Sequence, residues 1–183
     1  MAPPCLATVV VINRNGRHFL ADCFGALERQ TLPRHRFEVL FVDNASADGS
    51  ADYVRAHFPG VRIIHAGGNL GFTGANNLGI RLARGRHVVL LNNDTRVAAD
   101  WLETLLAAGE GDRIGGAVSR LLFLNDPDRV NSTGLVPYRD GRVGDRDLFR
   151  PASEADPPTG EVFGGCGASL LLTRGLLDDV GGL

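Results

Sequence analysis

The stretch FEVLFVDNASADGS, residues 37–50, sets the pattern from which the fold can be predicted. Its first part is rich in large apolar and β-branched residues, as is typical of a strand buried in a parallel sheet. A polar turn begins at Asp43 and offers several side chains that can cap the start of a helix. A buried strand, a polar turn and a helix in this order predict one βα unit of an α/β fold.

The same alternation recurs on both sides of that stretch. Apolar runs predict further strands over residues 8–12, 61–64 and 88–91, and Arg62 indicates an edge or half-exposed position for the middle one. A helix with one apolar face is predicted after each strand. Because strands and helices alternate, we expect a mostly parallel sheet with helices on both faces.

The second half of the chain is less regular. Asp100 and Glu103 resemble a capping box and predict another helix, and a fifth strand is predicted over residues 114–123. Asp, Pro, Gly and Arg then dominate residues 125–160, which predicts a long functional loop with short strands. An apolar run at residues 169–173 predicts a last strand, followed by a short helix.

Composition narrows the class of function. The 183 residues, 44% hydrophobic and 22% charged, suit a single globular domain, and no linker or internal repeat divides them. A formal charge of −2 argues against a general nucleic-acid binder. All 19 basic residues are Arg, which excludes mechanisms that need a lysine, such as a P-loop or a Schiff base.

The three cysteines lie far apart and form no zinc motif, and the N-terminus lacks a secretory signal. We therefore expect a cytoplasmic protein, and leave open a peripheral association with the inner face of the cell membrane. Cys166 stands in the run GGCG, residues 164–167, with no histidine that the sequence places beside it. A nucleophilic thiol needs a nearby base, so we expect this run to be a small-residue turn that lines a site.

Polar residues stand where the predicted parallel strands end. In an open α/β sheet, ligands bind outside the carboxyl ends of the strands, so these residues are the first candidates for a binding site. The glycine-rich loop at residues 67–74 precedes a helix, where backbone can approach a ligand closely. We expect the strand ends to converge on one edge of the sheet. The candidate residues are Asn13, Asp43, Asn69, Gly71, Asn76, Asn92, Asn93 and Asp94.

Each candidate has two interpretations when taken alone. The carboxylate of Asp94 could bind a divalent cation that bridges two phosphates, or could begin a turn. Asp43 could accept hydrogen bonds from a base or a ribose, or could cap a helix. Asn69 and Asn76 could bond a base or a sugar, or could only satisfy the backbone of the loop.

Five stretches match one set of family motifs in the right order: VVVINRNG, FEVLFVDNASADGS, GGNLGFTGANNLGIRLARG, VVLLNNDT and GGCGASLLLTRGLLDDVGGL. As a set they resemble glycosyltransferase family 2, in particular its rhamnosyltransferase-like members. The resemblance implies a GT-A fold, which is a Rossmann-like three-layer α/β/α sandwich with a mostly parallel central sheet. Residues 1–124 would form its nucleotide-sugar-binding half, and residues 125–183 part of its acceptor-side half.

The resemblance also implies a reaction. The enzyme would transfer a sugar, with inversion, from a dTDP-, UDP- or GDP-linked donor to a hydroxyl of a glycan or lipid-linked glycan in cell-surface polysaccharide synthesis. Asp43 would recognise the base, with Asn13 near it. Asn92-Asn93-Asp94 would stand at the family's Asp-x-Asp site, where Asn92 faces the ribose and Asp94 meets Mg²⁺ or Mn²⁺.

Two departures from the family pattern bear on activity. The Asp-x-Asp motif is Asn-x-Asp here, so we expect metal affinity to depend more on the diphosphate and water. The usual catalytic base would lie beyond Leu183, because Asp178 and Asp179 stand too early in the motif. We therefore expect the 183-residue chain to bind nucleotide but to transfer sugar poorly. The alternatives are a nucleotidyltransferase on a related sheet and a non-catalytic nucleotide-sugar-binding module.

Overall fold

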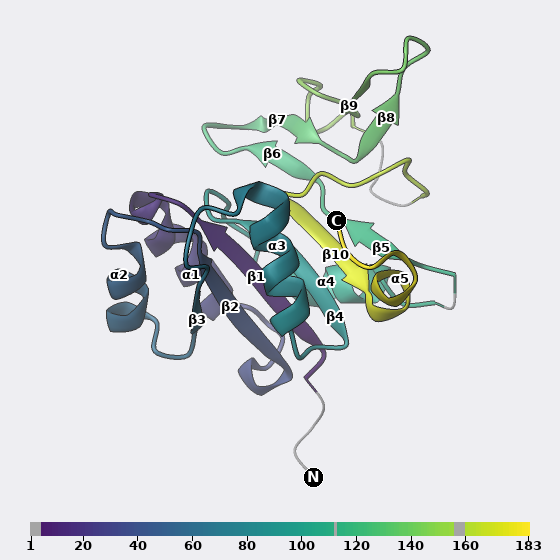
Figure 1. The fold of residues 1–183 in the computed structure, drawn as a ribbon. Helices are drawn as coiled ribbons and strands as arrows, with labels where there is room; N and C mark the ends of the chain where they lie inside the picture. The colour runs from purple at the N-terminus through teal and green to yellow at the C-terminus, as the bar shows by residue number, and fades with distance from the viewer. Residues whose placement is uncertain (1–4, 112, 156–159) are drawn as a thin grey trace.

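The computed structural model describes residues 5–111, 113–155 and 160–183. Its main body is a six-stranded sheet with the strand order β3-β2-β1-β4-β10-β5 (Figure 1). The first four of these strands run parallel, and β10 runs antiparallel to both of its neighbours, as expected of a mostly parallel sheet. The strands are β1 Ala7–Asn13, β2 Phe37–Asp43, β3 Arg62–His65, β4 His87–Asn92, β5 Gly116–Val118 and β10 Ser169–Thr173.

Helices cover both faces of this sheet and complete three layers (Figure 1). One core joins alternate residues of the central strands, such as Val9 and Val11, to the first, second and fourth helices. Val10 points to the opposite face, where the third and fifth helices pack. The helices are α1 Leu20–Glu28, α2 Ser50–His57, α3 Gly71–Leu82, α4 Trp101–Ala108 and α5 Arg174–Val180, with 3₁₀ turns at Arg17–Phe19 and Arg34–Arg36.

One glycine sets how closely α3 approaches the sheet. A Cβ atom added at Gly79 would overlap with Cγ1 of Val10 on β1. Both residues are buried, so neither the helix nor the strand has free space to absorb the overlap. The close packing of α3 on β1 matters for the site because the amino end of this helix lies at the carboxyl end of the sheet.

The edge position that Arg62 indicates is confirmed, because β3 is the outermost strand on its side. The continuous strand predicted over residues 114–123 is wrong. It is two strands, β5 and β6 (Leu121–Phe123), which belong to different sheets. The break lies at Ser119, whose hydroxyl bonds the hydroxyl of Ser169 at 2.7 Å and accepts from Trp101 Nε1 at 2.9 Å. The Ser119 N–H still donates to the Ser169 carbonyl at 3.3 Å, and the chain leaves the main sheet after this residue.

The capping box is also wrong, although the helix that it predicted is present. Asp100 precedes α4 but makes no side-chain hydrogen bond to the helix end. Glu103 instead accepts a hydrogen bond from Thr31 Oγ1 at 2.9 Å, so it ties α4 to the loop after α1. A tertiary partner replaces the local one that the sequence pattern predicts.

Two small antiparallel sheets occupy most of residues 121–145. β6 pairs with β7 (Asp126–Ser132), and β8 (Leu135–Pro137) pairs with β9 (Val143–Asp145). Figure 1 shows both pairs above the end of the main sheet to which β1 points. The prediction of a long loop with short strands is confirmed for the described part of this segment; residues 156–159 lie outside it.

Candidate functional site

The ends of three parallel strands meet at one rim, as their register requires. Asn13 on β1 lies opposite Asp43 on β2, and Ile12 lies opposite Asn92 on β4. The loops that follow these strands are therefore neighbours across the sheet, although they are far apart in the sequence.

An open cleft of about 360 Å³ lies at this rim. Six of the predicted site residues line it, and the other two, Asp43 and Asn76, do not. The Asp94 side chain is exposed at the cleft, whereas Asn13 is only 2% exposed. The lining residues are Ile12, Asn13, Arg14, Asn44, Asn69, Gly71, Phe72, Asn92, Asn93 and Asp94.

Asn13 joins the loops that follow β1, β2 and β4. Its amide nitrogen donates to Ser46 Oγ at 3.0 Å, and its amide oxygen accepts from Asn93 Nδ2 at 2.5 Å. Gly16 lies against this pair, and a Cβ atom there would be 2.6 Å from Asn13 Oδ1. The pair is thus held in place by hydrogen bonds and by a glycine, and it fixes the floor of the cleft.

Asp43 lies directly beside Asn13 across the sheet but does not line the cleft. One carboxylate oxygen accepts from the Ser46 backbone N–H at 3.1 Å, which is a local turn interaction. Asp43 does not cap a helix, because α2 begins at Ser50 with Gly49 at its N-cap position and no side-chain cap. The other oxygen lies 3.4 Å from His65 Nδ1, and the His65 side chain is 58% exposed. Asp43 therefore shapes the turn and also presents a carboxylate toward an exposed imidazole.

Asn44 was missed by the sequence reasoning, although it lies next to Asp43 in the polar turn. Its amide donates to Asn69 Oδ1 at 3.1 Å and to the Gly71 carbonyl at 3.3 Å. Its amide oxygen accepts from the Leu70 N–H at 2.8 Å. Asn44 is 5% exposed, so a single buried side chain holds the glycine-rich loop against the end of β2.

Asn76 has a different environment from the other candidates. It lies within α3, is 2% exposed, and donates to the Phe72 carbonyl one turn earlier at 3.1 Å.

The glycine run at residues 164–167 lies beside the cleft, because a Cβ atom at Gly167 would be 2.9 Å from the ring of Phe72. Asp179 lines a separate cleft with Arg86 and His87, at the opposite end of β4.

Oxygen atoms of one carboxylate and two side-chain amides line the rim, and their fit to a divalent cation can be tested against the chemistry of such ions. Among the described residues, no three His, Cys, Asp or Glu side chains gather into a site that could hold a metal by themselves. Asp94 supplies one carboxylate beside the amides of Asn92 and Asn93, and all three line the cleft. Mg²⁺ and Mn²⁺ favour oxygen ligands and keep positions for phosphate and water, so this donor set suits them.

Within the described ranges, no helix is both long and apolar enough to cross a bilayer.

Comparison with known proteins agrees with this geometry. Residues 8–179 match the family described as Glycosyl transferase family 2. Glycosyltransferase AglE of Haloferax volcanii is 29% identical over 117 residues, which are 61% of this chain and 38% of that protein. Glycosyltransferase GlyG of Streptococcus pneumoniae is 30% identical over 103 residues, which are 55% of this chain and 34% of that protein. The chain thus spans less than half the length of these relatives.

Solved structures of the same architecture cover nearly the whole chain. The mannosyltransferase PcManGT of Pyrobaculum calidifontis, in complex with GDP-Man and Mn²⁺, has a TM-score of 0.69 at 22% identity, over 96% of this chain and 46% of that one. TarS of S. aureus has a TM-score of 0.65 at 17% identity, over 95% of this chain and 48% of that one. The chain has the GT-A fold that its motifs imply. Fold and sequence motifs agree along almost its whole length, and the chain belongs to glycosyl transferase family 2.

Proposed function

We propose that this chain binds a nucleotide-diphospho-sugar with Mg²⁺ or Mn²⁺ at the rim cleft and carries the donor side of an inverting sugar transfer. The observation that carries the proposal is the shared rim of β1, β2 and β4, which brings Asp94 and Asn92 into one cleft with Asn13. A structural relative was solved with GDP-Man and Mn²⁺, and TarS was solved with UDP-GlcNAc at a TM-score of 0.57. Both ligands are nucleotide sugars of the class that we propose.

The proposed roles combine what the family resemblance implies with the place of each side chain. Asp43, beside Asn13 and His65, is proposed to recognise the base, and Asn92 the ribose. Gly71 begins α3 at the cleft, and its own N–H donates to Asn69 Oδ1 at 3.1 Å. The N–H groups that follow it in the first turn of α3 are proposed to meet the diphosphate. Asn93 is proposed to act through Asn13, to which it donates a hydrogen bond.

In the reaction, an acceptor hydroxyl oxygen bonds to the anomeric carbon while the bond from that carbon to the diphosphate oxygen breaks. The hydroxyl proton passes to a base, and the diphosphate leaves with the electron pair. A divalent cation, when bound, neutralises the charge that develops on the leaving diphosphate. Asp94 would hold that cation, and Asn13 with Asn93 would keep the floor of the cleft in place beneath the donor.

The finer assignments are proposals of the same kind. Transfer of a rhamnosyl or related hexosyl unit from a dTDP-, UDP- or GDP-linked donor to a glycan, in polysaccharide synthesis at the inner face of the membrane, is consistent with the motif set. The family match favours sugar transfer over nucleotidyl transfer. Asn76, buried within α3, is the candidate with the least direct route to a ligand and is proposed to stabilise the helix.

Calorimetric titration of UDP, dTDP and GDP, each with and without Mn²⁺, tests the proposal. We expect at least one nucleoside diphosphate to bind with Mn²⁺ and to bind much more weakly in EDTA. Asp94→Asn should remove the metal dependence, and Asp178→Asn on the exposed face of α5 should leave it unchanged. Binding of nucleoside triphosphates alone, or diphosphate binding that ignores both metal and Asp94→Asn, would refute it.

A further inference from the structure

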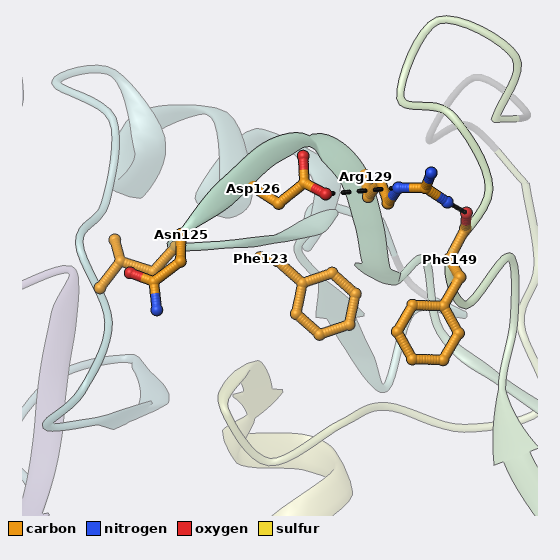
Figure 2. Close-up of a pocket in the computed structure, with 6 residues that line it drawn as sticks. Phe123, Asn125, Asp126, Arg129 and Phe149 are labelled. Carbon is orange, nitrogen blue, oxygen red and sulfur yellow. Dashed lines mark hydrogen bonds and ion pairs between the residues drawn. The ribbon is translucent and has the colours of Figure 1, made fainter.

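A second cleft lies on the β6–β7 pair, apart from the rim cleft and sharing no residue with it. Its volume is about 390 Å³. Figure 2 shows its two aromatic rings side by side, with polar side chains from β7 above them. The lining residues are Phe123, Leu124, Asn125, Asp126, Arg129 and Phe149.

The two rings pack on each other, and Phe149 is the one that is mostly exposed. Phe123 and Phe149 are parallel and stacked with an offset, with an interplanar angle of 8° and ring centroids 5.2 Å apart. Phe149 is 58% exposed, and Leu124 beside it is 50% exposed. Apolar surface left in water is unfavourable, so the exposed Phe149 ring and Leu124 offer apolar area that a ligand can cover.

Phe149 has a left-handed backbone conformation, which residues other than glycine rarely adopt. Phe149 has φ of 65° and Asp147 has φ of 60°, a conformation that costs a non-glycine residue free energy. The turn is nevertheless held by Asp147, which accepts from Thr133 Oγ1 at 2.6 Å and from Arg150 Nη1 at 2.8 Å. The Phe149 N–H also donates to the Val130 carbonyl at 2.8 Å. Strain at an exposed aromatic residue that its surroundings enforce indicates a functional position.

The polar groups above the rings carry balanced charge. Asp126 pairs with Arg129 Nε at 3.3 Å, and Arg129 Nη1 donates to the Phe149 carbonyl at 3.2 Å (Figure 2). Because the carboxylate and the guanidinium neutralise each other, the cleft favours a neutral ligand over an anion. With the Asn125 amide, these side chains offer both donors and acceptors to hydroxyl groups.

A pyranose ring has this combination of surfaces. One of its faces presents C–H groups that pack on an aromatic ring, and its rim presents hydroxyls that both donate and accept. We propose that the Phe123–Phe149 cleft binds a neutral sugar ring of the acceptor glycan. This inference rests on the proposed function, because only a sugar-transferring enzyme needs an acceptor subsite beside its donor cleft.

Topology supports the acceptor over the donor as the occupant. β10 is antiparallel to both β4 and β5, so β5 runs parallel to β4 and ends at the same rim as Asn92. Two residues later the chain enters β6, which carries Phe123 at its end. The β6–β7 pair therefore rises from the rim at which the donor is proposed to bind, and the nucleotide cleft itself lies elsewhere on that rim.

Saturation-transfer NMR with three neutral trisaccharides, built from glucose, mannose and rhamnose units, tests this inference on the whole chain. We expect at least one to receive saturation from the wild type. Phe149→Gly removes the ring, and the turn is retained because glycine adopts a positive φ readily. This variant should bind the trisaccharide about tenfold more weakly than the wild type. Phe149→Tyr keeps the ring face and should bind as the wild type does. Tyr138→Ala, which removes another exposed aromatic residue (50% exposed) beyond β8, should also leave binding unchanged.

The outcomes separate this inference from the proposed function. If nucleoside diphosphates bind with Mn²⁺ but no trisaccharide receives saturation, or if Phe149→Gly binds sugar as the wild type does, the acceptor subsite is refuted alone. If trisaccharides bind through Phe149 and no nucleotide binds, the donor proposal fails instead. A dimer that Phe149→Gly abolishes, without sugar binding, would replace the glycan by a second copy of the chain as the occupant.

Discussion

The sheet region and the β6–β9 region of this protein present side chains in two different ways. At the rim of the sheet, Asn13 and Asn44 are buried and bonded to neighbouring loops, and the strands below them are buried on both faces. In the second region, which runs from β6 to the turn just after β9, Phe149 is exposed. Hydrogen bonds and ion pairs of Asp147 close the turn that holds it. In the first region the packed core holds the side chains in position, whereas in the second a local network of hydrogen bonds and ion pairs does so.

This difference has a consequence for how each region responds to change. In a packed core, a small steric overlap displaces many neighbouring residues. In a polar turn, the loss of one hydrogen bond disturbs only the residues of that turn. We therefore expect substitutions under the sheet to lower the stability of the whole chain, and substitutions in the turn to alter one surface only.

The largest effect is expected under α3. Gly79→Ala places a methyl group against Val10, so the helix must move away from β1, and the free energy of unfolding should fall by about 1–3 kcal/mol. Urea denaturation followed by circular dichroism measures this change. Gly175→Ala is the matched control, since a Cβ atom there meets nothing within 4 Å. Equal stability of the two variants would show that the α3–β1 contact is not tightly packed.

The second effect concerns ligand binding at the rim, without a change in the core. Asp94→Asn removes a carboxylate that is exposed at the cleft, and the Mn²⁺-dependent affinity for the preferred nucleoside diphosphate should fall by at least about tenfold. The urea midpoint should stay at the wild-type value, since Asp94 is exposed. A variant that keeps its metal-dependent affinity would remove Asp94 from the site.

A third variant tests how the glycine-rich loop is held. Asn44→Ala removes the acceptor of the Leu70 N–H and the donor to Asn69 and Gly71, which should lower stability by about 1 kcal/mol. Amide hydrogen exchange at Leu70 should become faster, while exchange within β1 should speed up only by the factor that the global loss of stability gives. Unchanged exchange at Leu70 would mean that the loop is held by its own backbone.

The smallest effect is expected in the turn that presents Phe149, as pH falls. Hydrogen bonds from Thr133 and then Arg150 hold the pKa of the Asp147 carboxyl below its usual range. A carboxyl whose pKa is lower in the folded state adds stability at pH values above its unfolded-state pKa, and that stability is lost as pH falls through the folded-state value. We expect a loss below about 1 kcal/mol as pH falls below about 4, because Arg150 is half exposed.

NMR shifts of Phe149 report that transition, and Asp147→Asn should abolish it. Asp140→Asn, on the exposed turn between β8 and β9, is the control and should leave the transition in place. If the Phe149 signals titrate identically in Asp147→Asn, another group controls the turn.

Much of the fold could be predicted because buried positions require apolar residues, and their spacing can be read in the sequence. The apolar runs that predicted β1, β2 and β4 are those whose residues the core buries, and the expected convergence of their ends is present. The prediction failed where a tertiary partner replaced a local one. Glu103 bonds Thr31 instead of capping its own helix. One predicted strand is divided at Ser119, whose hydroxyl bonds Ser169 and Trp101 from distant parts of the chain.

The candidate site divides in the same way. The polar residues at strand ends could be found from the sequence, but Asn44 was missed because its importance depends on a loop 25 residues away. Nothing local distinguishes Asn76, which is bonded within α3, from Asn69, which lines the cleft. The pairing of Phe123 with Phe149 likewise joins two residues from different elements, each unremarkable by itself.

By itself, the sequence determined the layered α/β architecture of this protein. The spacing of apolar residues shows which side of each helix and strand is buried. It also determined that polar groups stand at the carboxyl ends of the strands. Only the tertiary structure decided the insertion of β10 between β4 and β5, the partners of Asn13 and Asn44, and the stacking of Phe123 on Phe149. The physical reason is that burial is a property of one residue and its water, whereas a hydrogen bond or a ring contact needs a second group that only the folded chain brings near.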